Sequence, residues 1–181
     1  MHKKKVLIPL PRYGCDPSEV AIPWLLLDEK LFEITFITPD GKIAITDDIM
    51  LTGKSLGLLK PILQARQDAV NAYRQMEKSP AFNSPLRYTD VSADDFDGLL
   101  LPGGHDKGVK EYLESDILQK LLVDFFNDNK PVAAVCHGVL IPARSIDEKT
   151  QKSVIYHYNC TGLLKRQELT AYHLTRLWLG D

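Results

Sequence analysis

The clearest chemical signal in the sequence is a cysteine and a histidine that follow an apolar run. Cys136 and His137 come directly after the small apolar residues 131–135, and a helical pattern follows them. A nucleophile on a sharp turn between strand and helix needs small neighbours, which Ala134 and Gly138 supply. The start of the following helix is expected to lower the thiol pKa to about 4–7. The pattern therefore predicts a cysteine nucleophile, with a buried, inert cysteine as the alternative.

A second candidate lies at the end of another apolar run, in the stretch "LLLPGGHD" at 99–106. Gly103 and Gly104 permit backbone conformations closed to other residues and let main-chain amides approach a ligand. The amides of Gly104 and His137 are candidates for an oxyanion hole, although a plain tight turn also explains the glycines. His105 follows the double glycine and is a candidate to line the pocket.

The third candidate is Glu19, which lies in a strong helix start. Asp16 is a capping residue, Pro17 suits the first helical position, and Glu19 fits the capping box. Glu19 is also a candidate carboxylic acid beside the thiol. Like charge and burial would there raise its pKa and keep it protonated as a donor. The two roles are compatible.

The sequence offers little sign of a metal or a cofactor. His157 and His173 are predicted to be structural or to lie on the surface. No pair of Cys or His residues has a common ligand spacing such as C-x-x-C, so we expect no metal. Since neither G-x-G-x-x-G nor a P-loop occurs, we expect no nucleotide and no other cofactor.

Five short apolar runs alternate with helical patterns and must position these candidates. Their apolar character is continuous, which indicates strands covered on both faces. The alternation predicts an α/β fold, a three-layer sandwich with a doubly wound, mostly parallel sheet that binds ligands at the carboxyl ends of its strands. The predicted strands are 5–10, 32–39, 96–104, 130–138 and 153–159, and further helices are predicted over 115–128 and 166–179.

The length of 181 residues suits one domain, 1–181. Residues 48–90 carry a helical pattern too long for a simple crossover, and we interpret them as a helical insertion. The last helical pattern runs to the end of the chain, which is consistent with a missing C-terminal segment.

Charge and cysteine content narrow the partners and the compartment. The formal net charge of −2 gives no reason to expect nucleic acid or an anionic membrane as a partner. No apolar run is long enough to cross a bilayer, and no signal peptide opens the chain. Three widely spaced cysteines argue against a disulfide framework, which favours a reducing, cytoplasmic setting.

Taken together, these segments resemble the ThiJ/PfpI superfamily, whose flavodoxin-like fold is that of class I glutamine amidotransferase domains. The ordered set Glu19, Gly103–Gly104 and Cys136–His137 carries the resemblance, and the tail 163–178 resembles longer bacterial and fungal members. The resemblance implies Cys136 as nucleophile, His137 as base and Glu19 as a protonated acid at the thiolate. It also implies the Gly104 and His137 amides as oxyanion donors, and a homodimer.

Two departures from the family pattern limit what is carried over. Ala134 replaces the first glycine of G-x-C-x-G and the distal His-x-Glu pair is absent, so glutamine hydrolysis is not expected. The acid that orients the histidine is also missing. Gly108 stands where protease-like members have a Glu, and no acid precedes Glu168 after the next predicted strand, where chaperone and glyoxalase members have one. A triad of Cys136, His137 and an acid that orients the histidine is therefore incomplete by sequence.

These features favour a cysteine-dependent enzyme acting on a small molecule. The leading hypothesis is conversion of a reactive 2-oxoaldehyde to a hydroxy acid without glutathione. Hydrolysis or hydration of a small amide or isonitrile at the same thiolate is a second enzyme class. A non-catalytic stress-response, chaperone or oxidation-sensing protein is the competing hypothesis.

Overall fold

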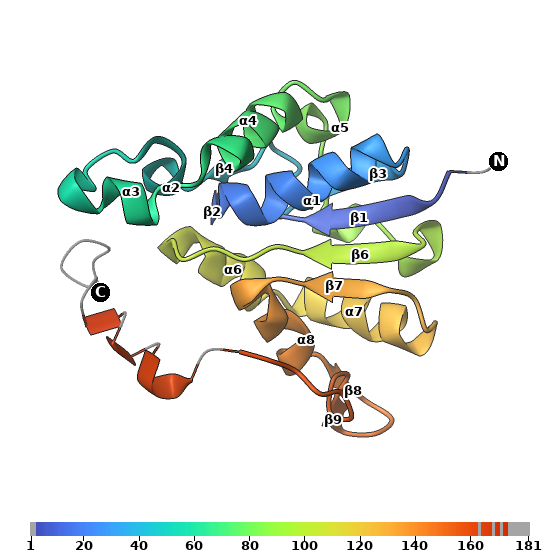
Figure 1. The fold of residues 1–181 in the computed structure, drawn as a ribbon. Coiled ribbons are helices and arrows are strands. Elements are labelled where there is room, and N and C mark those ends of the chain that lie inside the picture. The colour runs from blue at the N-terminus through green and yellow to red at the C-terminus, as the bar shows by residue number, and fades with distance from the viewer. Residues whose placement is uncertain (1–2, 163, 168, 171, 174–181) are drawn as a thin grey trace.

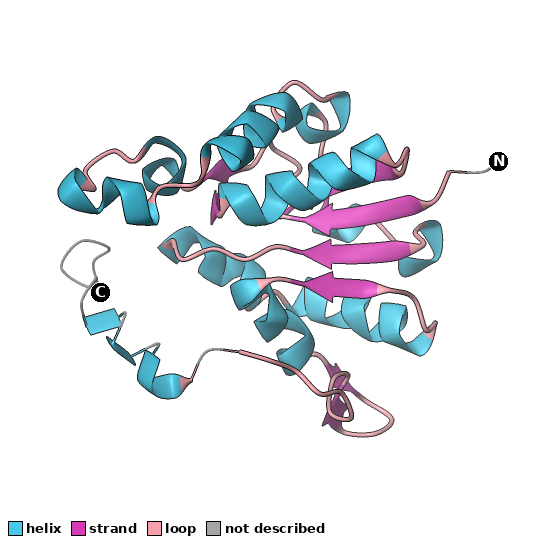
Figure 2. Ribbon diagram, viewed as in Figure 1, coloured by secondary structure: helices cyan, strands magenta, loops and turns pink. Residues whose placement is uncertain are grey.

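A computed structural model of the chain describes residues 3–173 except 163, 168 and 171. Its central sheet has five parallel strands in the order β5-β3-β1-β6-β7, which confirms the predicted α/β class (Figures 1 and 2). These strands are β1 (Lys5–Pro9), β3 (Glu33–Thr38), β5 (Leu86–Arg87), β6 (Gly98–Leu101) and β7 (Val132–Ala134).

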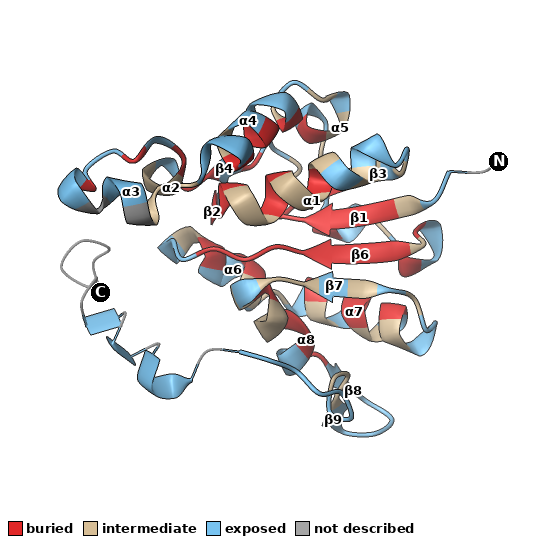
Figure 3. Ribbon diagram, viewed as in Figure 1, coloured by how far each residue is buried: buried red, intermediate tan, exposed pale blue. Residues whose placement is uncertain are grey.

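Helices cover both faces of this sheet, as continuous apolar strands predict. Along β1, Val6 and Ile8 join the hydrophobic cluster of α1 (Pro17–Glu29) and α4 (Gln67–Met76). Leu7 points the other way, into the cluster built on α7 (Asp116–Asn127) and α8 (Leu140–Arg144). Between these layers, β1 and β6 are buried along most of their length (Figure 3). The three-layer sandwich is confirmed.

The topology fixes where a ligand is expected to bind. The strands β3 and β5 extend the sheet on one side of β1, and β6 and β7 extend it on the other. The chain order therefore reverses between β1 and β6, and such a switch point opens a crevice at the carboxyl ends of the strands. The loops after β1, β6 and β7 all meet there.

Two predicted helix starts are confirmed. The side chain of Asp16 accepts hydrogen bonds from the backbone N–H groups of Ser18 and Glu19, and α1 follows with Pro17 in its first turn. The hydroxyl of Ser115 accepts from the N–H of Leu118 at the start of α7. Each cap satisfies backbone donors that a helix start leaves free.

Residues 48–90 hold several short helices and the strand β5, and they are built into the sandwich. Helix α4 packs against α1 through buried Ala72, Tyr73 and Met76, and β5 pairs with β3 as an edge strand. Residues 48–85 also hold the helices α2 (Asp48–Thr52), η1 (Gly57–Leu59), α3 (Lys60–Leu63) and α5 (Pro80–Asn83).

The prediction of a fifth strand over 153–159 is wrong. Only β9 (Lys152–Ser153) is extended, and it pairs with β8 (Ile146–Asp147) in an antiparallel hairpin outside the main sheet. Residues 154–158 form turns, in which Tyr156 and Tyr158 are exposed. An apolar run of this length occurs in turns as well as in strands, so periodicity alone did not separate the two.

The remaining short elements lie in connections, and β2 pairs with β4 in a small parallel sheet. Of the helix predicted over 166–179, residues 168, 171 and 174–179 lie outside the described residues, and the others are helical and exposed. Across the described part, no helix is long and apolar enough to cross a membrane. The short elements are β2 (Tyr13–Cys15), β4 (Ile45–Thr46), η2 (Tyr88–Asp90), η3 (Ala93–Asp95), η4 (Lys107–Val109), α6 (Lys110–Leu113) and η5 (Cys136–Val139).

Candidate active site

The loop after β6 ties the start of α1 to the turn after β7. The backbone N–H of Gly103 donates to Oε2 of Glu19 at 2.8 Å, and the N–H of Asp16 donates to the carbonyl of Gly103 at 3.1 Å. The thiol of Cys136 is hydrogen-bonded to the same Glu19 carboxylate. The structure therefore brings three of the predicted residues, Glu19, Gly103 and Cys136, into one site.

Cys136 lies in a strained turn at the end of β7. Its φ of 50° falls in the left-handed region, which non-glycine residues rarely adopt and which stores about 1–3 kcal/mol of strain. A side chain at Gly138 would collide with the carbonyl oxygen of Leu101, so the turn requires a glycine there. This geometry leaves Cys136 exposed, as a nucleophile elbow requires.

Two histidines flank the thiol. Nδ1 of His137 lies 3.7 Å from Sγ of Cys136, close enough for the ring to accept the thiol proton. The ring of His105 packs edge-on against that of His137, with 4.7 Å between centroids. One ligand atom from each of His105, Cys136 and His137 lies within 4.8 Å of the others, so these three residues can hold a metal ion.

Glu19 does not complete the capping box, although it stands at the third position of α1. The N-cap backbone N–H, which a capping-box glutamate would accept, donates instead to Gly103. Burial raises the pKa of Glu19, and the charge of Asp16 raises it further. Burial and like charge favour the protonated carboxyl group, whereas the hydrogen bonds with Gly103 and Cys136 favour the carboxylate.

The prediction of a lowered thiol pKa is wrong for this structure. The pKa of Cys136 is raised to about 11, first by partial burial of the thiol group and then by the charge and the hydrogen bond of Glu19. The backbone N–H of His137 opposes this shift. Because η5 and α8 are both short, the helix start offsets these effects only weakly. The raised pKa favours the thiol form of Cys136 over the thiolate.

The double glycine serves packing and main-chain contact. A side chain at Gly103 would come within 2.8 Å of the backbone nitrogen of His137 and 2.9 Å of Oε2 of Glu19. The N–H of Gly103 is already bound to Glu19, so Gly103 is not an oxyanion donor. Gly104 has φ of 151° and packs against the backbone of Gly14 and Asp16. The backbone N–H of His137 faces the sulfur of Cys136.

The comparison with protein families agrees with this constellation. A family described as ThiJ/PfpI family-like matches residues 10–174, a range that holds every residue of the site. The chain belongs to this ThiJ/PfpI-like family. The resemblance carried by Glu19, the double glycine and Cys136–His137 is confirmed.

Relatives of this ThiJ/PfpI-like protein include uncharacterized and enzymatic proteins. An uncharacterized protein of Schizosaccharomyces pombe is 26% identical over 182 residues, covering 94% of this chain and 67% of the relative. A deglycase of Thermococcus kodakarensis is 38% identical over 63 residues, 34% of this chain and 37% of its own. The crystal structure of glyoxalase III from Candida albicans matches with TM-score 0.68 and 21% identity, covering 96% of this chain and 74% of that one. At 21% identity, this structural match shows that the two chains share a fold.

The histidine of this ThiJ/PfpI-like site has no acidic partner in the described residues. No carboxylate there forms an ion pair with His137, and its neighbours are the Cys136 sulfur and the His105 ring. Gly108, at the family position of an orienting acid, packs against Tyr13 and Asp106.

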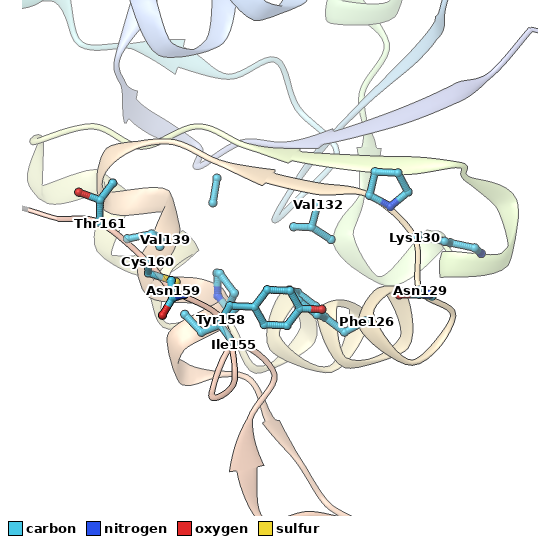
Figure 4. A pocket seen from close by; sticks show the side chains of 13 residues that line it. Phe126, Asn129, Lys130, Val132, Val139, Ile155, Tyr158, Asn159, Cys160 and Thr161 are labelled. Carbon is cyan, nitrogen blue, oxygen red and sulfur yellow. The ribbon is translucent and has the colours of Figure 1, made fainter.

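Two of the larger cavities lie away from the thiol. One of about 490 Å³ lies between β7, α7 and residues 155–161, and Cys160 is part of its wall (Figure 4). Another of about 750 Å³ is apolar and lies over the amino-terminal half of the sheet, next to Lys4 and Gly98. Cys136 lines neither of these two cavities, and the site of this ThiJ/PfpI-like protein is identified by its backbone strain and hydrogen bonds.

Sequence reasoning missed two features of the site. Asp16 was assigned only as a cap, yet its buried charge raises the pKa of both Glu19 and Cys136. His105 was expected to line a pocket, and its contact with the ring of His137 was not foreseen. A signal for both exists in the sequence: His105 adjoins the end of the predicted strand 96–104, and Asp16 lies in the connection that follows the predicted strand 5–10 at the same edge of the sheet.

Proposed function

We propose that this protein converts small 2-oxoaldehydes, such as methylglyoxal, to hydroxy acids without glutathione. One observation carries the proposal: the exposed thiol of Cys136 has a proton acceptor, His137 Nδ1, at 3.7 Å and a half-buried carboxyl group, Glu19, hydrogen-bonded to the same sulfur. A nucleophile, a base and an acid are the groups that aldehyde addition needs. The names of the deglycase relative and of the glyoxalase III structure support aldehyde chemistry.

In the first step, Sγ of Cys136 attacks the aldehyde carbon while its proton passes to Nδ1 of His137. The carbonyl electron pair moves to oxygen, which is stabilised by the His137 backbone N–H and takes a proton from Glu19, and a hemithioacetal forms. His137 passes the proton that it took to the Glu19 carboxylate or to solvent, and its neutral imidazole then removes the hydrogen of the former aldehyde carbon. The enediolate takes this proton back at the neighbouring carbon, and the hydroxyl proton moves to the former ketone oxygen, which gives a thioester. The resulting thioester adds one water, which releases the hydroxy acid and restores the thiol.

The test is lactate formation from methylglyoxal by purified protein in the presence of EDTA. Wild type should form lactate, and Cys136→Ser should lose at least about 10³-fold in turnover because the nucleophile and its partners act as a unit. Cys160→Ser removes the other exposed thiol and should match wild type. The proposal is wrong if wild type makes no lactate, or if Cys136→Ser keeps wild-type turnover.

A second candidate is a binding protein that uses Cys136 to sense oxidants. It is favoured by the lack of an acid that orients His137 within the described residues. Peroxide would oxidise Sγ to a sulfenic acid and be reduced to water. Absence of lactate, together with selective oxidation of Cys136 over Cys160 by dilute peroxide, would favour this candidate.

A further inference from the structure

We propose that His105, Cys136 and His137 form a zinc site that blocks the nucleophile reversibly. The residues come from two loops that the sequence separates and the sheet joins. β6 and β7 pair in parallel register, so His105 after β6 and Cys136 after β7 emerge at the same edge. No local spacing in the sequence signals this combination.

The distances suit a small metal ion after a minor adjustment. Bond lengths of about 2.0–2.3 Å to tetrahedral zinc place neighbouring ligand atoms about 3.3–3.6 Å apart. Sγ of Cys136 and Nδ1 of His137 are already 3.7 Å apart, and all three ligand atoms lie within 4.8 Å of one another. Closing the site needs a shift of about 1 Å, and His105 is exposed and has room to rotate.

The donor set selects the class of ion. One thiolate and two imidazoles suit zinc and other borderline or soft transition ions, whereas magnesium and calcium prefer oxygen ligands. Three protein ligands leave the fourth position to water. Cys136 and His105 are exposed, which gives the ion a path from solvent.

Binding exchanges one proton for one metal bond. The Cys136 S–H bond breaks, its proton goes to solvent, and the sulfur lone pair forms the zinc–sulfur bond. The zinc–thiolate unit carries one net positive charge, and the Glu19 carboxylate, which is hydrogen-bonded to Cys136, lies beside it. Zinc-bound sulfur cannot attack an aldehyde, so zinc should inhibit turnover. This last consequence rests on the proposed function, whereas metal binding itself does not.

The test is a titration of EDTA-treated, desalted protein with Zn²⁺ against a chromophoric chelator, and a parallel titration with Co²⁺. Wild type should bind one ion, and Co²⁺ should show a thiolate-to-cobalt charge-transfer band. Since loss of a residue that merely orients a ligand costs about 10–100-fold, His105→Ala should weaken binding by about 100-fold or more. Cys136→Ser should abolish the band. His157→Ala removes an exposed histidine outside the cluster and should behave as wild type.

The titration contradicts the proposal if His105→Ala binds zinc as tightly as His157→Ala, or if wild type shows no charge-transfer band. Thermal unfolding of each variant checks that it is folded. A second measurement uses the wild-type chain alone: zinc should slow alkylation of Cys136 but not of Cys160, which is exposed and serves as an internal control. Equal slowing at both thiols would also contradict the site.

The activity assay separates this proposal from the proposed function. Zinc-dependent, EDTA-reversible loss of lactate formation would support both. A protein that binds zinc through Cys136 and His105 but makes no lactate would refute the proposed function alone. Turnover that zinc leaves unchanged at saturating binding would refute the blocking role.

Discussion

The carboxylate of Glu19 accepts a hydrogen bond from the backbone N–H of Gly103 at 2.8 Å. This bond and the reverse bond from Asp16 to the carbonyl of Gly103 hold the start of α1 against the end of β6. The acid is therefore positioned by main-chain groups. One of its oxygens is fixed by that contact, and the carboxyl group still reaches the sulfur of Cys136.

Glu19→Gln should separate the position of this group from its acidity. Glutamine keeps a carbonyl oxygen for the Gly103 N–H but cannot exchange a proton near neutral pH. We expect turnover of methylglyoxal to fall by about 10²–10⁴-fold, the usual contribution of a general acid or base, with little change in thermal stability. Lactate formation and thermal unfolding measure the two effects. Glu29→Gln, at the exposed far end of α1, is the control, and wild-type turnover in Glu19→Gln would rule out an acid role.

The alkylation rate of Cys136 should keep rising as pH increases through 8 to 10, because its pKa is raised to about 11. The negative charge of Glu19 contributes to the raised pKa of Cys136, so Glu19→Gln should lower the thiol pKa and speed alkylation at pH 8. Burial, the largest cause, remains in the variant. Iodoacetamide kinetics with peptide mapping, in EDTA, give the rate at each thiol. A rate that levels off below pH 8 would instead support the lowered pKa predicted from the sequence.

Gly103→Ala should damage both stability and turnover. The added methyl group would lie 2.8 Å from the backbone nitrogen of His137 and 2.9 Å from Oε2 of Glu19, so the loop must shift. Overpacking of this kind costs about 1–3 kcal/mol of unfolding free energy. Urea unfolding and lactate formation measure both effects. Gly162→Ala is the matched control, since none of the described residues lies within 4 Å of its new methyl group, and equal behaviour of the two variants would contradict the packing.

Asp16→Ala should destabilise the protein through the helix start. It removes the side-chain acceptor of two backbone N–H groups, those of Ser18 and Glu19, which costs about 0.5–2 kcal/mol. Asp16→Asn keeps an acceptor oxygen and should stay close to wild type in urea unfolding. An Asp16→Ala variant as stable as Asp16→Asn would show that the cap contributes nothing.

The fold and most of the site follow from local sequence signals. Four of the predicted strands and the capped starts of α1 and α7 are present, because continuous apolar runs and capping residues act locally. The strand Leu86–Arg87 was missed since it is two exposed residues long and is defined by its pairing with β3. Such an element has no hydrophobic pattern of its own.

The chemistry was harder to predict than the positions. Glu19, Gly103 and Cys136 meet as expected, yet the thiol pKa moves in the opposite direction from the prediction. The start of the helical turns after Cys136 is expected from the sequence to lower the thiol pKa. In the structure, burial and the Glu19 carboxylate raise this pKa by more than the helix start lowers it. The balance between those effects depends on burial, which only the folded chain defines.

The hydrogen bond from Gly103 to Glu19 joins positions 84 residues apart. Loop closure over such distances comes late, after local helices have formed, because its entropy must be offset by contacts made elsewhere. Intermediates that contain the helices but lack the paired β1 and β6 have no assembled site. During refolding, the proposed turnover should therefore return only after the central strands have paired, later than the helical circular dichroism signal.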